Sequence, residues 1–183
     1  VSLQGGYERR LRKALATDLG SVSRLGCLYK AGKDKAGRNV FVVVGSRFPA
    51  READDELTLL YIISVMDQHV HQPYTLVFVN TNFSLVNNQP LPAWFATAYE
   101  TLDRRYKKNL KHLIVLHPSI AGRTLLLGLR ALVSQKFWKK VKYSETVSEL
   151  YKDVRKEEIV LPDFCDEYDR EQQTSLMTSI LPW

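Results

Sequence analysis

Val40-Phe41-Val42-Val43-Val44 is the stretch of this sequence that decides the fold. Five consecutive apolar residues, four of them valine, are typical of a β-strand. Side chains along a strand alternate between the two faces of its sheet, so a strand that is apolar at every position must be covered on both faces. Such strands occur in parallel or mixed sheets with helices on either side. The stretch therefore predicts an α/β fold.

The segments around this strand repeat the same alternation of strand and helix. Four further strands are expected, at residues 27–29, 74–80, 113–116 and 141–143. Helical periodicity is found at residues 7–18, 53–70, 92–109, 122–137 and 147–154, and a polar loop at residues 81–90. We predict an α/β protein in which a mixed β-sheet is flanked by helices, with the helix at residues 53–70 deeply buried.

The size and composition of the chain predict one domain with additions at both ends. The sequence has 183 residues, of which 45% are hydrophobic and 25% charged, as in an ordinary globular domain. We expect an N-terminal helix and lead-in at residues 1–25, the domain itself at residues 26–165, and a C-terminal tail at residues 166–183. The tail is first acidic and then rich in Ser and Thr, and either partial docking or disorder fits it.

Cysteine usage and hydropathy favour a cytoplasmic location. Cys27 and Cys165 lie far apart and have neither a disulfide nor a zinc-ligand spacing, which fits a reducing compartment. The longest apolar run, residues 57–66, reaches only half of the roughly 20 residues that a membrane span needs. Because the chain begins at Val1 and shows no signal peptide, we interpret it as a piece of a longer cytoplasmic protein that can associate peripherally with membranes.

Positive charge is concentrated in residues 104–143, which hold eleven Lys or Arg residues and no Asp or Glu. Without these eleven, 15 basic residues face 20 acidic ones, so the remainder of the chain is net negative. Such segregation predicts a surface for an anionic partner, either phosphate, an anionic bilayer or an acidic protein face. Alternatively, acidic segments elsewhere in the chain fold back over it. The candidate contacts for an anionic surface are Arg104, Arg105, Lys107, Lys108, Lys111, Lys136, Lys139, Lys140 and Lys142.

The sequence carries no signature of a known catalytic site. GxGxxG, GxxxxGK[ST] and GxSxG are all absent. His69 and His71 are two residues apart, which does not place both on one helical face for a metal. His117 precedes a proline at a strand end and has no partner that the sequence identifies, so a structural, hydrogen-bonded role is the better interpretation. We predict a non-enzymatic domain that uses neither a metal nor a cofactor.

Three motifs in the second half of the chain resemble the divergent CRAL-TRIO domains, which are also called BCH domains. The motifs are Tyr106-Lys107-Lys108-Asn109-Leu110-Lys111, His117-Pro118 and Lys136-Phe137-Trp138-Lys139-Lys140-Val141. Such domains occur in a class of Rho GTPase-activating proteins and their relatives. The resemblance extends over about residues 7–169, and the upstream half is similar to one member of the family in particular.

The resemblance implies the CRAL-TRIO lipid-binding fold, with a lipid-sized apolar cavity closed by a mobile helix after the His-Pro position. In this chain that helix lies at residues 122–133, although a leucine stripe is also typical of ordinary core. The candidate pocket or gate residues are Leu76, Phe78, Ile114, Leu116, Leu125, Leu126, Leu129 and Leu132. The glycines that end the lipid-transfer members are missing from Leu161-Pro162-Asp163-Phe164-Cys165-Asp166, so headgroup identity is not transferable.

Two functions from different classes follow. The first is a non-catalytic, lipid-binding and membrane-associating module that holds a phospholipid or other hydrophobic ligand in the pocket and meets anionic headgroups with its basic face. The alternative is a protein-interaction scaffold that binds a small GTPase or a second copy of itself. A scaffold tolerates a collapsed cavity, whereas a lipid binder does not. Aromatic residues interleave the basic ones, but no RNA-recognition motif supports nucleic-acid binding.

Overall fold

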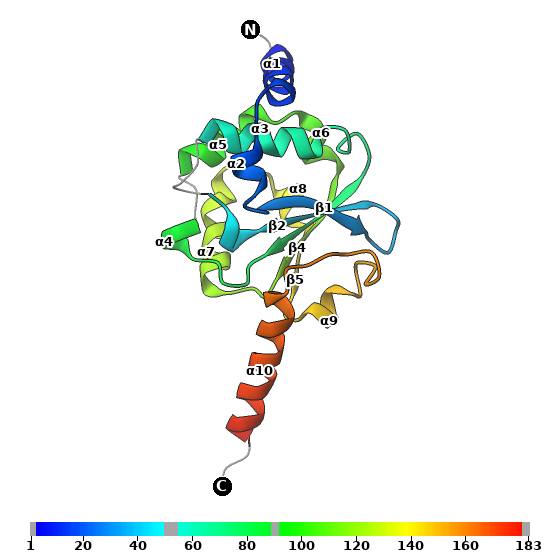
Figure 1. Cartoon of the computed structure of the whole chain (residues 1–183), viewed down its shortest axis with the longest axis vertical. Helices are drawn as coiled ribbons and strands as arrows, with labels where there is room; N and C mark the ends of the chain where they lie inside the picture. The colour runs from blue at the N-terminus through cyan, green and yellow to red at the C-terminus, as the bar shows by residue number, and fades with distance from the viewer. Residues whose placement is uncertain (1–2, 50–54, 89–91, 181–183) are drawn as a thin grey trace.

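A five-stranded sheet in the order β1-β2-β3-β4-β5 forms the centre of the molecule (Figure 1). The computed structural model describes residues 3–49, 55–88 and 92–180. The strands are β1 (Leu28–Lys33), β2 (Asn39–Val44), β3 (Tyr74–Val79), β4 (Leu110–Leu116) and β5 (Val141–Ser144). β1 is antiparallel to β2, and the other three pairs are parallel. The mixed sheet that the sequence predicts is confirmed.

The strand order places three helical connections on one face of the sheet. A crossover between parallel strands is almost always right-handed, so a chain that moves steadily across the sheet puts each crossover on the same side. We call this side the crossover face. The helices that cover it are α1 (Leu3–Ala16), α2 (Gly20–Ser23), α3 (Asp55–Met66), α5 (Pro92–Thr101), α6 (Arg104–Asn109), α7 (Ile120–Gly128) and α8 (Gln135–Trp138). The short helices η1 (Gly45–Arg47), α4 (Leu85–Asn88) and η2 (Leu129–Ala131) complete these connections.

The opposite face is covered by the C-terminal part of the chain, and we call it the C-terminal face. Its core joins the sheet to α9 (Val147–Leu150) and to residues 154–165. Val42, Val77 and Ile114 form a row of directly paired, fully buried residues across this face. Phe41 packs in the core of the crossover face, so β2 is covered on both sides as its unbroken apolar sequence requires.

The N-terminal lead-in is part of the core of the crossover face. Tyr7, Ala14 and Val22 are buried in it, and α1 packs along α3. The Tyr7 hydroxyl donates to Asp67 Oδ1 and lies 3.1 Å from the hydroxyl of Tyr106. The described part of this lead-in, residues 3–25, therefore packs with the domain that follows it.

Two helices expected from periodicity are interrupted in the structure. The helix at residues 92–109 divides into α5 and α6, because the Asp103 side chain accepts the Arg105 N–H and caps a new helix. The helix at residues 122–137 divides into α7, η2 and α8, with Ser119 capping the first. In both cases the apolar periodicity continues across the break, so it gives no sign of the interruption.

The described part of the predicted C-terminal tail is helical, and its start docks on the sheet, in agreement with partial docking, the first of the two alternatives. α10 (Phe164–Ile180) begins on the C-terminal face and then extends away from the sheet, at the opposite end of the molecule from α1 (Figure 1). Its first turns pack against the core through Cys165. Parts of four predicted segments, at residues 1–2, 53–54, 89–90 and 181–183, lie outside the described residues. Within the described ranges, no helix is both long and apolar enough to cross a membrane.

A buried aspartate fixes the turn between β1 and β2 and ties it to β3. Asp34 is 1% exposed, and its Oδ1 accepts the N–H groups of Ala36 and Arg38, each at 2.9 Å. Its Oδ2 accepts Arg38 Nε at 2.6 Å and Thr75 Oγ1 at 2.8 Å. Burial alone would raise the pKa of Asp34, but these hydrogen bonds and the guanidinium charge outweigh burial and lower it.

We expect Asp34→Asn to lower the free energy of unfolding by about 2–4 kcal/mol, because the amide leaves buried donors without acceptors. Since the folded pKa of Asp34 is depressed, its contribution is present above the unfolded pKa of about 3.9 and is lost as pH falls through the folded pKa. Urea unfolding at pH 7 and pH 3 measures both effects. Asp163→Asn, at an exposed position, is the matched control, and equal stability of the two variants would contradict the assignment.

Candidate functional site

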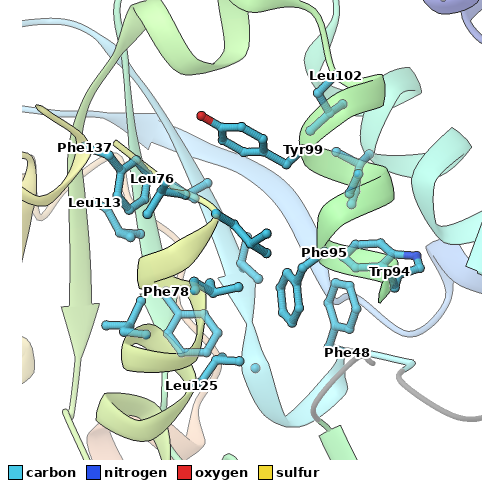
Figure 2. Close-up of a pocket in the computed structure, with 18 of the residues that line it drawn as sticks. Phe48, Leu76, Phe78, Trp94, Phe95, Tyr99, Leu102, Leu113, Leu125 and Phe137 are labelled. Atoms are coloured by element: carbon cyan, nitrogen blue, oxygen red, sulfur yellow. The ribbon is translucent and has the colours of Figure 1, made fainter. Parts of the chain in front are cut away.

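A cavity of about 330 Å³ lies on the crossover face, between the sheet, α5 and the α7–η2–α8 segment. Figure 2 shows Trp94 and Phe95 of α5 on one side, and Leu125 of α7 together with Leu76 and Phe78 of the sheet on the other. The lining consists of Val43, Gly45, Phe48, Ile62, Leu76, Phe78, Phe83, Asn88, Trp94, Phe95, Ala98, Tyr99, Leu102, Leu113, Leu125, Leu126, Leu129, Leu132, Val133 and Phe137.

Packed aromatic rings form one wall of the cavity. Trp94 contacts Phe48 and Phe95 edge to face, with ring centroids 5.3 and 5.5 Å apart. Phe78 and Phe83 form a similar pair at 5.7 Å. Edge-to-face pairs of this kind are favourable beyond the apolar area that they bury. Because these rings hold one another in place, they do not collapse into the neighbouring space.

Two polar side chains of the lining, those of Asn88 and Trp94, form hydrogen bonds within the protein. Asn88 Nδ2 donates to the Ser46 carbonyl at 3.0 Å, and Trp94 Nε1 donates to the Asp55 carbonyl at 3.1 Å. Tyr99 lies at one end, where Figure 2 shows its hydroxyl beside the cavity. The described lining therefore offers hydrocarbon and aromatic surface to a ligand, and its chemistry is that of an apolar solvent.

Six of the eight candidate pocket residues lie together around this cavity, and two do not. Those that line it are Leu76, Phe78, Leu125, Leu126, Leu129 and Leu132. Ile114 and Leu116 are fully buried in the core of the C-terminal face, and this placement is a correction. Strand side chains alternate between faces, so the cavity side of β4 is formed by Leu113 instead. The uniformly apolar sequence of β4 contains no alternation that distinguishes the two faces.

Sequence reasoning missed the aromatic half of the cavity. Phe48, Trp94, Phe95, Tyr99 and Phe137 line it but were not among the candidates. The helical pattern of residues 92–109 did identify an amphipathic helix, which is the only signal that pointed to Trp94, Phe95 and Tyr99. An apolar side of a helix can either fill the core or line a cavity, depending on the distance between the packed helices. The spacing of residues in the sequence does not reveal that distance.

α7 presents apolar side chains both to the cavity and to the outside. Leu125 and Leu126 are buried on the inner side. Leu127, which belongs to the expected leucine stripe, is 61% exposed, and Ile120 at the start of the helix is 86% exposed. The wall of the cavity is therefore also an exposed apolar surface of the molecule.

The basic segment divides into a paired part and an unpaired part. Arg105 contacts Asp103 at 2.8 Å and Asp67 at 3.8 Å, and Lys142 forms an ion pair with Asp153. For these two residues the chain's own acids supply the partner. Lys142 alternates with Val141 and Tyr143 on β5 and is paired in register with Ile114, so it belongs to the C-terminal face. Arg104 is exposed on α6.

Six lysines gather where α6, the start of β4 and α8 meet, and we call them the lysine cluster. Its members are Lys107, Lys108, Lys111, Lys136, Lys139 and Lys140. Lys140 Nζ donates to the Lys107 carbonyl at 2.9 Å, which joins α6 to the end of α8. Among the described residues, no carboxylate lies within ion-pair distance of any of the six. Lys108, Lys111, Lys136 and Lys139 are exposed, whereas Lys107 and Lys140 are half-buried.

A buried histidine joins the carboxyl end of the sheet to α10. His117 is 3% exposed, its Nδ1 lies 2.7 Å from Thr81 Oγ1, and its Nε2 lies 3.0 Å from Asp169 Oδ1. Because a carboxylate only accepts, Nε2 carries the hydrogen and Nδ1 accepts from the Thr81 hydroxyl. The other oxygen of Asp169 accepts the Val147 N–H at 2.7 Å. His117 has a φ of 52°, an uncommon left-handed backbone conformation for a residue other than glycine.

The hydrogen bonds of His117 and Asp169 hold α10 to the carboxyl end of the sheet. Burial lowers the pKa of His117 even though the Asp169 carboxylate opposes that shift, so the ring is neutral in the folded protein at neutral pH. The Tyr168 ring covers the imidazole, with centroids 4.5 Å apart. The structural, hydrogen-bonded role expected for this histidine agrees with these contacts, and its carboxylate partner comes from the predicted tail. Across the described ranges, no group of three His, Cys, Asp or Glu side chains is arranged to hold a metal ion.

The fold and the cavity together correspond to a known domain class. Residues 37–171 match the divergent CRAL/TRIO domain, and the chain belongs to this family. This confirms the resemblance carried by the motifs around Lys107, His117 and Lys136.

The similar proteins include Rho GTPase-activating proteins and relatives of ganglioside-induced differentiation-associated protein 2, which is the member that the upstream half resembles. Rho GTPase-activating protein gacY of Dictyostelium discoideum is 39% identical over 157 residues, which cover 86% of this chain and 22% of that protein. The GDAP2 homolog of Drosophila melanogaster is 36% identical over 169 residues, 92% of this chain and 31% of that protein. Ganglioside-induced differentiation-associated protein 2 of Xenopus laevis is 32% identical over 176 residues, 96% of this chain and 35% of that protein. The chain thus spans about a third or less of the length of these relatives.

We expect Asp169→Asn to lower the free energy of unfolding by about 1–3 kcal/mol, because the amide cannot accept from both His117 and the Val147 N–H. In the unaltered protein, stability should fall as pH drops below about 6.5, since the folded His117 excludes a proton that the unfolded chain binds. Urea unfolding between pH 7.5 and pH 5 measures both the loss of stability in the variant and the pH dependence of the unaltered protein. Asp166→Asn, on the exposed side of the same helix, is the control, and a loss no larger than in this control would contradict the anchoring role.

Proposed function

We propose that this domain is a non-catalytic lipid-binding module that associates peripherally with anionic membranes. The observation that carries the proposal is the cavity, whose lining is almost entirely apolar and whose Asn88 and Trp94 side chains bond within the protein. Pockets that bind small molecules have volumes of about 300–1,000 Å³, and the cavity of 330 Å³ falls within that range. Membership of the CRAL/TRIO family supports the proposal.

The energetics of the cavity suit a hydrocarbon chain. Each methylene moved from water into an apolar site contributes about 0.8 kcal/mol, so ten buried methylenes give roughly 8 kcal/mol before the costs of association. That gross value is enough for stable binding of a chain that is itself poorly soluble. The ligand's polar end would lie at the rim, because the lining is almost entirely apolar and the polar groups of Asn88 and Trp94 already bond within the protein.

Two exposed features support membrane association. The lysine cluster offers positive charge that is not neutralised by the described part of the chain, and each Lys near an anionic surface contributes about 1 kcal/mol. Ile120 and Leu127 on α7 present apolar side chains to the outside. A bilayer provides a favourable environment for both kinds of side chain at once. α7 would then lie between the cavity and the membrane, which gives a lipid a short path between them.

Filling the cavity should remove lipid binding without unfolding the domain. Ala98 lines the cavity on α5, and Ala98→Phe places a ring in that space. We expect the fraction of protein that carries a lipid in native mass spectrometry, after incubation with vesicles that contain both phospholipids and single-chain lipids, to fall at least tenfold.

Ala93→Phe is the matched control, because Ala93 is exposed on the same helix and does not line the cavity. Val133→Trp provides a second, independent filling variant on the opposite wall. Thermal unfolding of each variant verifies the fold. Lipid occupancy that stays unchanged in both folded filling variants, or that is absent from the unaltered protein, would sink the proposal.

Reversing the charge of the exposed lysines should abolish binding to anionic vesicles. We expect Lys108→Glu/Lys136→Glu/Lys139→Glu to lower the affinity for phosphatidylserine vesicles at least a hundredfold in a sedimentation assay at 0.1 M salt. Lys35→Glu/Lys152→Glu/Lys156→Glu carries the same net charge but alters exposed lysines that lie outside the cluster. Similar losses of vesicle affinity in the two triple variants would show that binding depends on net charge alone, and would contradict the assignment of the lysine cluster as the membrane-binding surface.

A protein-interaction scaffold is the second candidate function. It is favoured by the relatives that are Rho GTPase-activating proteins and by the unpaired charge of the lysine cluster, which complements an acidic protein face. The partner would be a small GTPase or a second copy of this chain. Titration of a purified Rho-family GTPase, and the oligomeric state by light scattering, distinguish this candidate from a purely lipid-binding module.

A further inference from the structure

One end of the cavity lies against Lys107, one of the two half-buried lysines of the cluster. Tyr99 and Leu102 line this end, and Figure 2 shows Phe137 across from them on the other side of the lining. Lys107 Nζ lies 4.0 Å from the centroid of the Tyr99 ring and donates to the Tyr99 carbonyl at 2.8 Å. Both of these contacts hold the Lys107 ammonium group against a residue of the lining.

Lys140 approaches the same end from the other side. Its backbone N–H bonds to the Phe137 carbonyl at 2.9 Å, and its Nζ donates to the Lys107 carbonyl at 2.9 Å. The Lys107 ammonium group is therefore fixed against the Tyr99 end of an otherwise apolar space, and the Lys140 ammonium group lies beside it, at the backbone of Lys107. Lys107 belongs to α6, and Lys140 to the turn after α8.

Neither ammonium group has an anionic partner within the part of the chain that the structure describes. Each ammonium group donates one hydrogen bond to a backbone carbonyl, although it has three N–H donors. The negative charge of Asp103 acts on the Lys107 ammonium group, but Asp103 forms its ion pair with Arg105. Burial lowers the pKa of Lys107, and burial together with the positive charge of Lys111 lowers that of Lys140. An anion at this position would stabilise both charged forms.

The volume of the cavity limits how much hydrocarbon it can hold. A water-sized group takes up about 30 Å³, and a methylene is of similar size, so 330 Å³ holds on the order of ten such groups. That corresponds to most of one medium-length chain. The two acyl chains of a membrane phospholipid contain several times as many carbons.

We infer that the cavity binds a single-chain amphiphile whose anionic head, a carboxylate or a phosphate, is held by Lys107 and Lys140 at the Tyr99 end. This inference rests on the proposed lipid-binding function and makes it specific. The chain lies among the leucines of α7 and the aromatic residues of α5. The head remains at the rim, where two ammonium groups provide charge-assisted hydrogen bonds that the apolar lining cannot.

The test compares ligands that share one chain and differ in the head. Isothermal titration calorimetry measures the binding of dodecanoate, dodecyl phosphate and dodecanol, each below its micellar concentration, to the unaltered protein. We expect the better of the two anions to bind at least tenfold more tightly than dodecanol, and the order of the two anions identifies the head that the site prefers. Lys107→Gln/Lys140→Gln should reduce this preference to less than threefold, whereas Lys152→Gln/Lys156→Gln should leave it unchanged.

The outcomes separate this inference from the function on which it rests. Equal binding of dodecanol and both anions, or a head preference that survives in the folded Lys107→Gln/Lys140→Gln variant, would overturn the lysine anchor while lipid binding stands. Stoichiometric uptake of intact two-chain phospholipid from vesicles, in preference to the single-chain ligands, would overturn the single-chain assignment. If no lipid of either kind binds, the proposed function fails as well.

Discussion

The rest of the structure depends on one constraint, which is that the central strands are apolar on both faces and both faces must be covered. Because the sheet runs in sequence order and its crossovers share one hand, the three connections between parallel strands all lie on the crossover face. The C-terminal face receives instead a single stretch of chain, from α9 to the first turns of α10. The two faces are therefore closed in different ways.

This difference explains where the cavity lies. On the C-terminal face, a continuous segment follows the sheet and leaves a tightly packed core around Val42, Val77 and Ile114. On the crossover face, α5 and α7 belong to separate connections, and rigid aromatic pairs around Trp94 keep the space between them open. An apolar space open to a ligand thus results from the way the sheet is connected.

Much of the architecture could be predicted from residues 40–44, because an unbroken apolar strand has few alternatives. The helices of the second half were less predictable, since apolar periodicity continues through the capping residue Asp103, where one helix ends and another begins. The cavity could be predicted in part. Leu125 and Leu126 were found through their spacing and the family resemblance, but the assignment of Ile114 failed because a uniformly apolar strand does not reveal which face each side chain takes. Arg105 pairs with Asp103, which lies just outside the basic segment, whereas the pairing of Lys142 with Asp153 depends on how the chain folds back after β5.

The contact between His117 and Asp169 also affects how the chain is made. The His117 imidazole gains its carboxylate partner only after Asp169, 52 residues downstream, has been synthesised. A ribosome synthesises these residues over several seconds at about 5–20 residues per second, and during that time the carboxyl end of β4 has no cover from α10. A nascent chain that stops before Asp169 would expose an apolar sheet face, which makes such fragments prone to aggregation and to chaperone recognition. Closure of the C-terminal face therefore requires that the first turns of α10 have been synthesised.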